Sequence, residues 1–103
     1  MVDRKTAINT AHSFVNECRL NGLNFYKVIL FGSFARNDIH ESSDIDLLVI
    51  SDQFTDNIFD NIKLLAKANI KFPIIEVHPY STSDYLSGVD FIKEVEKESI
   101  VIA

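Results

Sequence analysis

The sequence predicts a single α/β domain of the α+β type, in which a small mixed β-sheet is packed with helices. Two short β-rich runs, 26–31 and 44–51, are separated only by a turn and a loop, and helical patterns precede and follow the pair. A third β-rich run, 72–77, comes before the last helical pattern. This order of elements differs from the regular alternation of a doubly wound fold. With 103 residues, 47% of them hydrophobic, we expect one packed domain over 1–103.

Three segments carry apolar residues at the three- and four-residue spacing of a helix, namely 3–20, 58–66 and 91–95. Gly22 is expected to end the first of them. Short helical turns are expected over 34–37 and after 81–83. Polar residues that can cap a helix stand at the expected starts of the long segments: Asp3, Thr55 or Asp56, and Asp90.

The strand predicted over 44–51 is apolar on both faces beyond its first residues, which indicates that it is covered on both sides. The run 26–31 is too short for a typical helix and stops at Gly32. Pro73 places the third strand, or its start, at a sheet edge, because proline cannot donate a hydrogen bond to a central ladder. Which strands pair with one another is left open by the pattern.

Charge and composition argue against several classes of function. A net charge of -5 and a pI near 5.0 do not suit a surface that neutralises a long nucleic acid, which requires clustered Lys and Arg. No apolar run approaches membrane-spanning length, and the first nine residues lack the apolar core of a signal peptide. The single cysteine, Cys18, cannot form an internal disulfide. We therefore expect a cytoplasmic protein that acts without a membrane.

Two aspartates, Asp44 and Asp46, open the strand 44–51. Because side chains alternate across a strand, both are expected on one face, about 7 Å apart along it. Leu48 and Ile50 continue that face into the core, and two like charges beside a low-dielectric core favour a cation between them. Mg²⁺ takes carboxylate oxygens together with substrate phosphates. The pair is therefore a candidate Mg²⁺ site. An isolated Asp-x-Asp would more often be a strand cap beside a solvated carboxylate, so the prediction depends on the Gly-Ser pair that precedes it.

A Gly-Ser pair ends the preceding strand, and ten residues separate it from Asp44. Gly32 has no Cβ, so a triphosphate can approach the backbone there, while the Ser33 hydroxyl and nearby amides can donate to phosphate oxygens. Arg36 lies on the same side of the turn and can hold the terminal phosphates. Taken singly these residues fit a plain turn and a surface ion pair. Their spacing from the aspartates favours a nucleoside triphosphate as ligand.

Glu76 is the candidate third acid. It shares its face of the run 72–77 with His78, and it can reach the aspartates if that strand lies beside 44–51. It would then act as metal ligand or as base for an acceptor hydroxyl, and two metal ions would stabilise an in-line attack on the α-phosphate. The alternative is a surface residue of an edge strand. The three histidines are scattered without metal-ligand spacing, so no zinc site is expected.

The aromatic residues divide into two expected groups. Four phenylalanines are expected in the core and not as platforms for a base: Phe14, Phe59, Phe72 and Phe91. Three tyrosines are candidates to line a nucleotide base: Tyr26, Tyr80 and Tyr85.

From Leu30 to Ile50 the sequence reads LFGSFARNDIHESSDIDLLVI. A hydrophobic-Gly-Ser, a ten-residue gap and an Asp-hydrophobic-Asp-hydrophobic resemble the signature of the DNA polymerase β-like nucleotidyltransferase superfamily. The stretch is similar to the minimal nucleotidyltransferases, the MntA-like antitoxins paired with HEPN-domain toxins. The family usually has Asp where this chain offers Glu76. It commonly has Gly at the position of Asn37, a residue type that tolerates the left-handed conformation.

The resemblance implies a minimal nucleotidyltransferase domain in which Gly32 and Ser33 hold nucleotide phosphates and Asp44 and Asp46 bind Mg²⁺, with Glu76 as third ligand. It implies an Mg²⁺-dependent protein adenylyltransferase that moves a nucleoside monophosphate, AMP from ATP, to a hydroxyl of a partner protein. That partner would be a HEPN ribonuclease toxin, which forms a complex with this protein, its antitoxin. The alternative is a degenerate member that neutralises its HEPN partner by binding alone.

Overall fold

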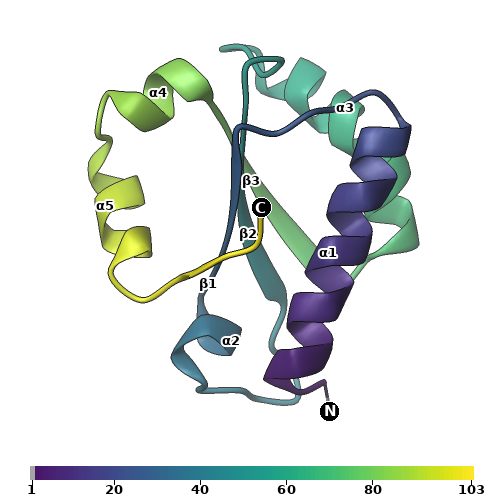
Figure 1. Ribbon diagram of the computed structural model, residues 1–103, viewed down its shortest axis with the longest axis vertical. Helices are drawn as coiled ribbons and strands as arrows, with labels where there is room; N and C mark the ends of the chain where they lie inside the picture. Colours follow the sequence, from purple (N-terminus) through teal and green to yellow (C-terminus); the bar gives the residue numbers. More distant parts are fainter. Residues whose placement is uncertain (1) are drawn as a thin grey trace.

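A four-stranded mixed sheet with the order β3-β2-β1-β4 forms the centre of the protein, as seen in a computed structural model that describes residues 2–103 (Figure 1). Strand β1 pairs antiparallel with both β2 and β4, and β2 pairs parallel with β3. The α+β class predicted from the sequence is confirmed. The strands are β1 Lys27–Phe31, β2 Ile45–Ser51, β3 Ile75–Ser81 and β4 Ile100–Val101.

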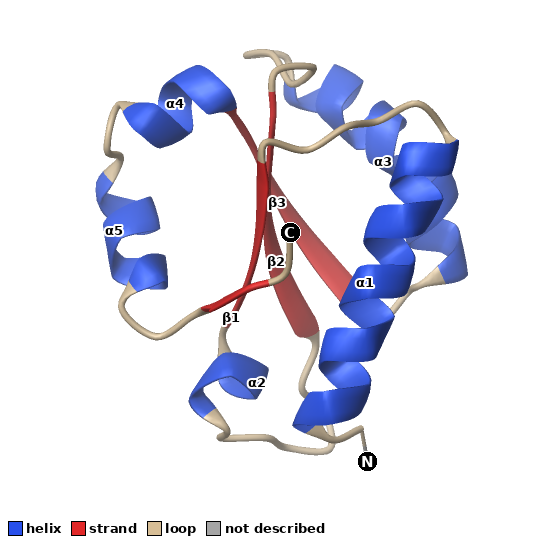
Figure 2. Cartoon of the chain, viewed as in Figure 1, coloured by secondary structure: helices blue, strands red, loops and turns tan. Residues whose placement is uncertain are grey.

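Helices cover both faces of the sheet (Figure 2). Helix α1, Arg4–Leu20, and helix α3, Ile58–Lys71, lie on one face, and α4, Thr82–Leu86, and α5, Asp90–Glu96, lie on the other. The one-turn helix α2, Ser33–Arg36, lies at the end of the sheet where β1 leads into the loop before β2. Each face of β2 is therefore packed against helices, as its sequence pattern predicts.

The side chains of β2 alternate between two apolar cores. Ile45, Leu47 and Val49 belong to the core under α1 and α3, whereas Leu48 and Ile50 belong to a smaller core under α5. All five are fully buried. At roughly 1.5–3 kcal/mol for each large aliphatic side chain removed from water, β2 is the main apolar anchor of the fold.

Helix α1 begins and ends as its sequence predicts. The Asp3 carboxylate accepts a hydrogen bond of 2.7 Å from the Thr6 amide, and this bond lowers the pKa of Asp3. At the other end Gly22 has a φ of 90°, and the Leu23 amide donates to the Cys18 carbonyl, which satisfies a carbonyl of the last turn.

The caps predicted for the other two long helices are wrong. Helix α3 is capped by Asn57, whose Oδ1 accepts hydrogen bonds from the amides of Phe59 and Asp60. Neither Thr55 nor Asp56 has this role, because the chain turns into the helix one residue later. Asp90 is the first residue within α5, where its negative charge stabilises the helix by facing the positive end of the helix dipole.

Strand β3 lies further along the chain than the predicted run 72–77. The Phe72 carbonyl accepts a hydrogen bond from the Ile75 amide, so residues 72–74 form the turn after α3. The strand then continues through Pro79 to Ser81, alongside the whole of β2. This is possible because β3 is an edge strand, the position that Pro73 predicted.

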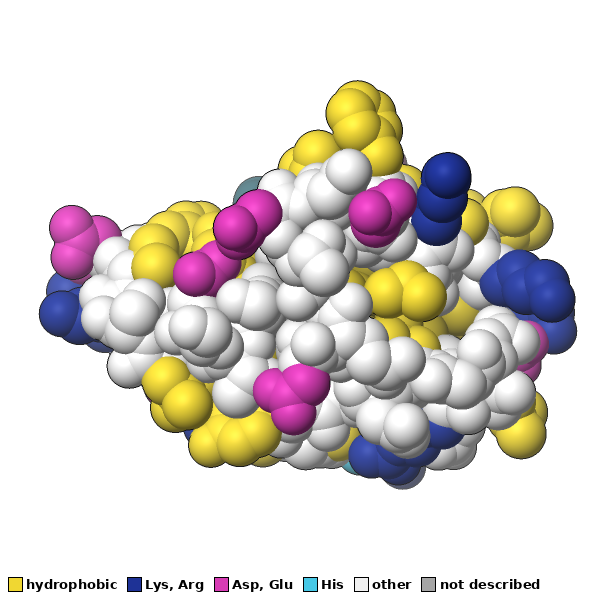
Figure 3. All heavy atoms as spheres, turned by 90° about the horizontal axis from the view of Figure 1, so that it is seen from above, with side chains coloured by type: hydrophobic (Ala, Val, Ile, Leu, Met, Phe, Trp, Pro, Cys, Tyr) yellow, Lys and Arg dark blue, Asp and Glu magenta, His cyan; other side chains and the backbone are white. Residues whose placement is uncertain are grey.

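Acidic and basic side chains are interspersed on the face of the molecule seen in Figure 3, where apolar side chains also reach the surface. Two phenylalanines that were predicted in the core are exposed: Phe59 is 74% exposed and Phe91 is 41% exposed. Neither ring belongs to either of the two apolar cores. None of the helices in residues 2–103 has the length and hydropathy needed to cross a membrane.

Candidate active site

The turn between β1 and α2 requires a glycine at position 32. Gly32 has φ 77° and ψ -152°, a backbone region that is essentially restricted to glycine. A Cβ at this position would overlap Asp46 Oδ2 and lie 3.2 Å from Asp46 Cγ. Gly32 therefore permits both the sharp turn and the close approach of the Asp46 carboxylate.

Helix α2 is held in place near its C-terminal end. The Arg4 guanidinium of α1 donates a hydrogen bond of 2.8 Å to the Ala35 carbonyl. Asn37 ends the helix in the left-handed conformation, with φ 58°, which confirms the tolerance expected of Asn at this position. Ser33, the first residue of the helix, is half-buried, and no side chain caps the helix start. Arg36 is exposed and enters none of the ion pairs found in residues 2–103.

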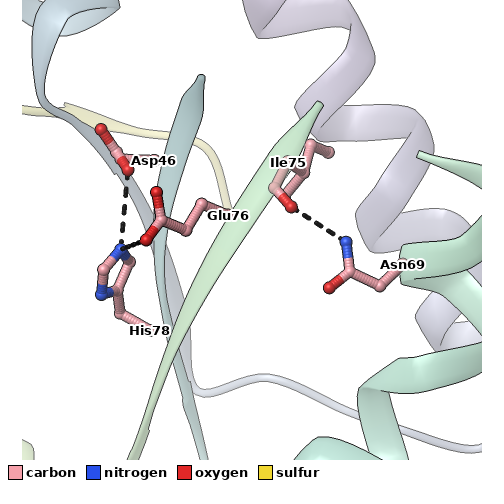
Figure 4. A network of polar contacts seen from close by, with 5 residues as sticks. All are labelled: Asp46, Asn69, Ile75, Glu76 and His78. Atoms are coloured by element: carbon pink, nitrogen blue, oxygen red, sulfur yellow. Dashed lines mark hydrogen bonds and ion pairs between the residues drawn. The ribbon is translucent and has the colours of Figure 1, made fainter. Parts of the chain in front are cut away.

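The pairing of β2 with β3 places Asp46 directly opposite Glu76. Strand β3 does lie beside β2, which is the condition under which Glu76 can approach the aspartates. His78 follows two residues after Glu76 on the same face, and its Nε2 lies 3.6 Å from Asp46 Oδ1 and 3.9 Å from Glu76 Oε1 (Figure 4). The three side chains form one cluster, here called the Asp46–Glu76–His78 cluster.

The cluster lies at the boundary between the core and solvent. The Asp46 side chain is 23% exposed, whereas the Glu76 side chain is 57% exposed. Burial raises the pKa of Asp46, the nearby negative charge of Glu76 raises it further, and His78 partly opposes both effects. Asp46 is therefore the carboxylate that benefits most from an added positive charge.

The donor atoms of the cluster fit a divalent cation. One ligand atom from each of the three residues lies within 4.8 Å of the other two. His78 Nε2 is buried and has no hydrogen-bond partner among the described residues, although two carboxylates lie close to it. Two carboxylate oxygens and an imidazole nitrogen suit Mn²⁺ as well as Mg²⁺, because imidazole is a ligand that transition metals accept readily.

Asp44 stands apart from this cluster in the described chain. It precedes the first residue of β2, its side chain is exposed, and it is absent from the group of ligand atoms that converge. Asp44 lines a cleft of about 420 Å³ at the β3 edge of the sheet, together with Glu76 and residues of α3 that include Ile62 and Asn69.

His78 is the site residue that the sequence analysis did not select. The histidines lack the spacing of zinc ligands along the chain, whereas His78 meets Asp46 through strand pairing. A signal was present, because Glu76 and His78 are two residues apart in a strand and must share a face.

Comparison with known proteins identifies the family to which this sequence is similar. The family model described as "Nucleotidyltransferase domain" matches residues 13–102. Two curated proteins of Methanocaldococcus jannaschii are similar. "Putative protein adenylyltransferase MJ0604" is 43% identical over 49 residues, which are 48% of this chain and 46% of that protein. "Putative protein adenylyltransferase MJ1305" is 35% identical over 72 residues, 69% of this chain and 49% of that protein. The chain spans about half the length of these relatives.

Two solved structures share the fold. A crystal structure of a "putative nucleotidyltransferase" from Sulfolobus solfataricus has a TM-score of 0.68 and 22% identity, covering 95% of this chain and 80% of that one. A "toxin-antitoxin with AMP-PNP" has a TM-score of 0.61 and 20% identity, covering 89% of this chain and 72% of that one. The family model spans nearly the whole sequence, including the Gly32 turn and the strands that carry Asp46 and Glu76, and the chain therefore belongs to the nucleotidyltransferase domain family.

Proposed function

We propose that this chain is a divalent-metal-dependent nucleotidyltransferase that transfers AMP from ATP to a hydroxyl of a partner protein. The observation that carries this proposal is the meeting of Asp46 and Glu76 next to the Gly32 turn. The Gly32 turn can hold phosphates, and the carboxylates of Asp46 and Glu76 can hold a cation against those phosphates. The names of the two archaeal relatives support protein adenylylation as the reaction.

The residues of the turn would bind the triphosphate. Gly32 leaves room for phosphate oxygens beside the backbone, and the Ser33 hydroxyl and the amides of the turn would donate hydrogen bonds to them. Arg36 is exposed at the end of the same helical turn, where its guanidinium would hold the terminal phosphates through two parallel hydrogen bonds. Arg4 supports this arrangement by anchoring the Ala35 carbonyl.

The carboxylates would hold the cation and prepare the acceptor. Asp46, Glu76 and the exposed Asp44 are the proposed carboxylate ligands, and His78 adds a nitrogen donor. A bound Mg²⁺ or Mn²⁺, as one ion or two, would supply positive charge against the oxygens of the α-phosphate. Glu76, the more exposed of the paired carboxylates, would accept the proton of an incoming hydroxyl. The acceptor oxygen then bonds to the α-phosphorus, and pyrophosphate leaves.

The partner that we propose is a HEPN-domain ribonuclease toxin, which would make this protein an antitoxin. The structural neighbour described as a toxin-antitoxin with AMP-PNP supports a pairing of this fold with a protein partner and a nucleotide. The resemblance of the segment from Leu30 to Ile50 to antitoxins of the MntA type supports the HEPN assignment.

Transfer is tested by incubating the protein with ATP labelled at the α-phosphate, a divalent metal and the protein encoded by the neighbouring gene. The expected result is label on that protein, and loss of label with Asp46→Asn. The matched control is Asp52→Asn, which changes an exposed aspartate just beyond β2. If wild type and Asp46→Asn label the neighbour equally, the proposed transfer is wrong. If neither transfers label but both neutralise the toxin, the protein acts by binding alone.

A further inference from the structure

Three aromatic rings, those of Phe31, Tyr80 and Phe91, gather beside the Asp46–Glu76–His78 cluster. Phe31 of β1 lies edge-on to His78, with ring centroids 5.0 Å apart, and Phe91 of α5 lies 6.2 Å from the His78 ring. Phe91 also packs edge-on to Phe31 at 6.0 Å and nearly parallel to Tyr80 at 6.1 Å. The aromatic surface made by Phe31, His78, Tyr80 and Phe91 is therefore continuous with the carboxylates.

Phe91 is the member of this surface that is turned toward solvent. It is 41% exposed, whereas Ile92, the next residue of α5, is 1% exposed and packs into the core under that helix. A large aromatic ring that remains exposed while its neighbour is buried adds little to the core. It does leave an apolar ring available beside the cluster.

The Phe91 ring packs on two levels of the sheet, against Phe31, which pairs with Asp46, and against Tyr80, four residues beyond Glu76. The proposed phosphate site at Gly32 lies at the end of the sheet where β2 begins, next to Asp46. Strand β3 runs parallel to β2, so His78 and Tyr80 lead away from α2 by about 7 Å for every two residues. A nucleotide with its terminal phosphates at α2 and its α-phosphate at the carboxylates would extend its base along this path.

The cleft of about 420 Å³ is the rival position for the base. Two of the proposed metal ligands, Asp44 and Glu76, line this cleft. Its walls also include Ile75 and Val77, which alternate with Glu76 and His78 along β3 and therefore lie on the opposite face of the sheet. Figure 4 shows the cluster on one side of the strands and Asn69, another residue of the cleft, on the other side. A base in that cleft would have to pass around the edge of the sheet.

We propose that Phe91 is the stacking platform for the nucleobase, with Tyr80 supporting its ring from behind. This inference rests on the proposed function, because it takes the phosphate and cation positions from it. Stacking on an aromatic ring is tolerant of base identity, so Phe91 contributes affinity for any nucleoside triphosphate and distinguishes nucleotides from inorganic polyphosphate.

The test compares two ligands, ATP and inorganic tripolyphosphate, by titration calorimetry with Mn²⁺ present. Phe91→Ala is expected to raise the Kd for ATP by roughly 5- to 150-fold, the range for loss of one base stack, and to leave the Kd for tripolyphosphate unchanged. Phe91→Leu keeps the side chain apolar without a ring and is expected to weaken ATP in the same way, which guards against a folding defect in the alanine variant. Phe59→Ala, which removes a 74% exposed ring from α3, is the matched control and should change neither ligand.

The outcomes separate the two proposals. Unchanged ATP affinity in both Phe91 variants overturns the platform while the proposed transfer stands. Equal weakening of ATP and tripolyphosphate also overturns it, because Phe91 would then act on the phosphate site. If Ala66→Phe, which fills the cleft, weakens ATP and the Phe91 variants do not, the base lies in the cleft. Failure of the wild-type protein to bind ATP with either Mn²⁺ or Mg²⁺ overturns the proposed function itself.

Discussion

Gly32 lies so close to Asp46 that a Cβ on residue 32 would overlap the Asp46 carboxylate. The turn that begins α2 and the strand that carries the candidate metal ligand are thus fitted to each other. The contact links two residues that are 14 positions apart in the sequence. It explains why a glycine and an aspartate at this spacing form one site.

The first prediction concerns the stability of glycine variants. Gly32→Ala is expected to lower the free energy of unfolding by more than the roughly 1–3 kcal/mol that a strained backbone costs, because it adds a collision. Gly22→Ala is the matched control, since φ is 90° there but the new Cβ meets nothing within 4 Å. Chemical denaturation of both variants measures the difference.

A double-mutant cycle isolates the collision. Asp46→Ala removes Oδ2 and Cγ, so Gly32→Ala should cost less in that background than in the wild-type protein, and what remains is the cost of the backbone conformation at residue 32. If the cost of Gly32→Ala is the same with and without the Asp46 carboxylate, the close contact is wrong.

The second prediction is that Asp46→Asn stabilises the protein at neutral pH. Burial and the charge of Glu76 raise the pKa of Asp46 in the folded state, so the folded state holds its proton more tightly than the unfolded state. The ionised carboxylate therefore destabilises the fold. This cost is absent below the unfolded pKa of about 3.9, grows as the pH rises through the folded value, and is complete above it.

The measurement is thermal unfolding without metal from pH 3 to pH 8. The Tm of Asp46→Asn should exceed that of wild type at pH 7–8, and the two curves should converge in acid. A wild-type protein that is the more stable of the two at pH 8 would contradict the assigned environment of Asp46. A stable Asp46→Asn also makes loss of activity in that variant easy to interpret.

The third prediction concerns His78 and the choice of metal. An imidazole nitrogen suits Mn²⁺ better than Mg²⁺. The substitution His78→Ala should therefore lower the affinity for Mn²⁺ by about tenfold and the affinity for Mg²⁺ by less. Calorimetric titration of each metal in the presence of ATP provides the comparison. His12→Ala is the control, because His12 is an exposed residue of α1 remote from the cluster. Unchanged affinity for both metals would show that His78 is no ligand, and an equal loss for both would contradict the preference for Mn²⁺.

The fourth prediction concerns Cys18, which is buried under α1. Burial raises the pKa of Cys18 to about 12, so at pH 8 only about one thiol in ten thousand is ionised. Iodoacetamide should leave the folded protein unmodified at pH 8 and should react promptly once urea unfolds it. Mass spectrometry detects the adduct, and rapid labelling without denaturant would be inconsistent with this packing.

The sequence predicted the parts of the site that depend on local pattern. The glycine turn and the two-sided burial of β2 follow from residue type and alternation alone, and the left-handed Asn37 agrees with the glycine that the resembling family commonly has there. The approach of Glu76 to Asp46 was predicted only as a condition, since it requires β3 to pair with β2 in one register, and register is set by tertiary packing.

Features that depend on which elements meet were missed. His78 joins the site because β3 extends past Val77, whereas the predicted strand stopped there. Phe91 was expected in the core because its helix is amphipathic, and the pattern does not show that the residue lies at the rim of the apolar face. Asn57 caps α3, although Thr55 and Asp56 are residue types that cap helices equally well.

The most direct test is whether ATP binding depends on the paired carboxylates and on a divalent metal. Titration calorimetry with Mn²⁺ or Mg²⁺ is predicted to detect ATP binding to the wild-type protein, with no binding after EDTA or in Asp46→Asn combined with Glu76→Gln. ATP binding of equal strength in the double variant, or in EDTA, would contradict a metal-dependent nucleotide site at this cluster.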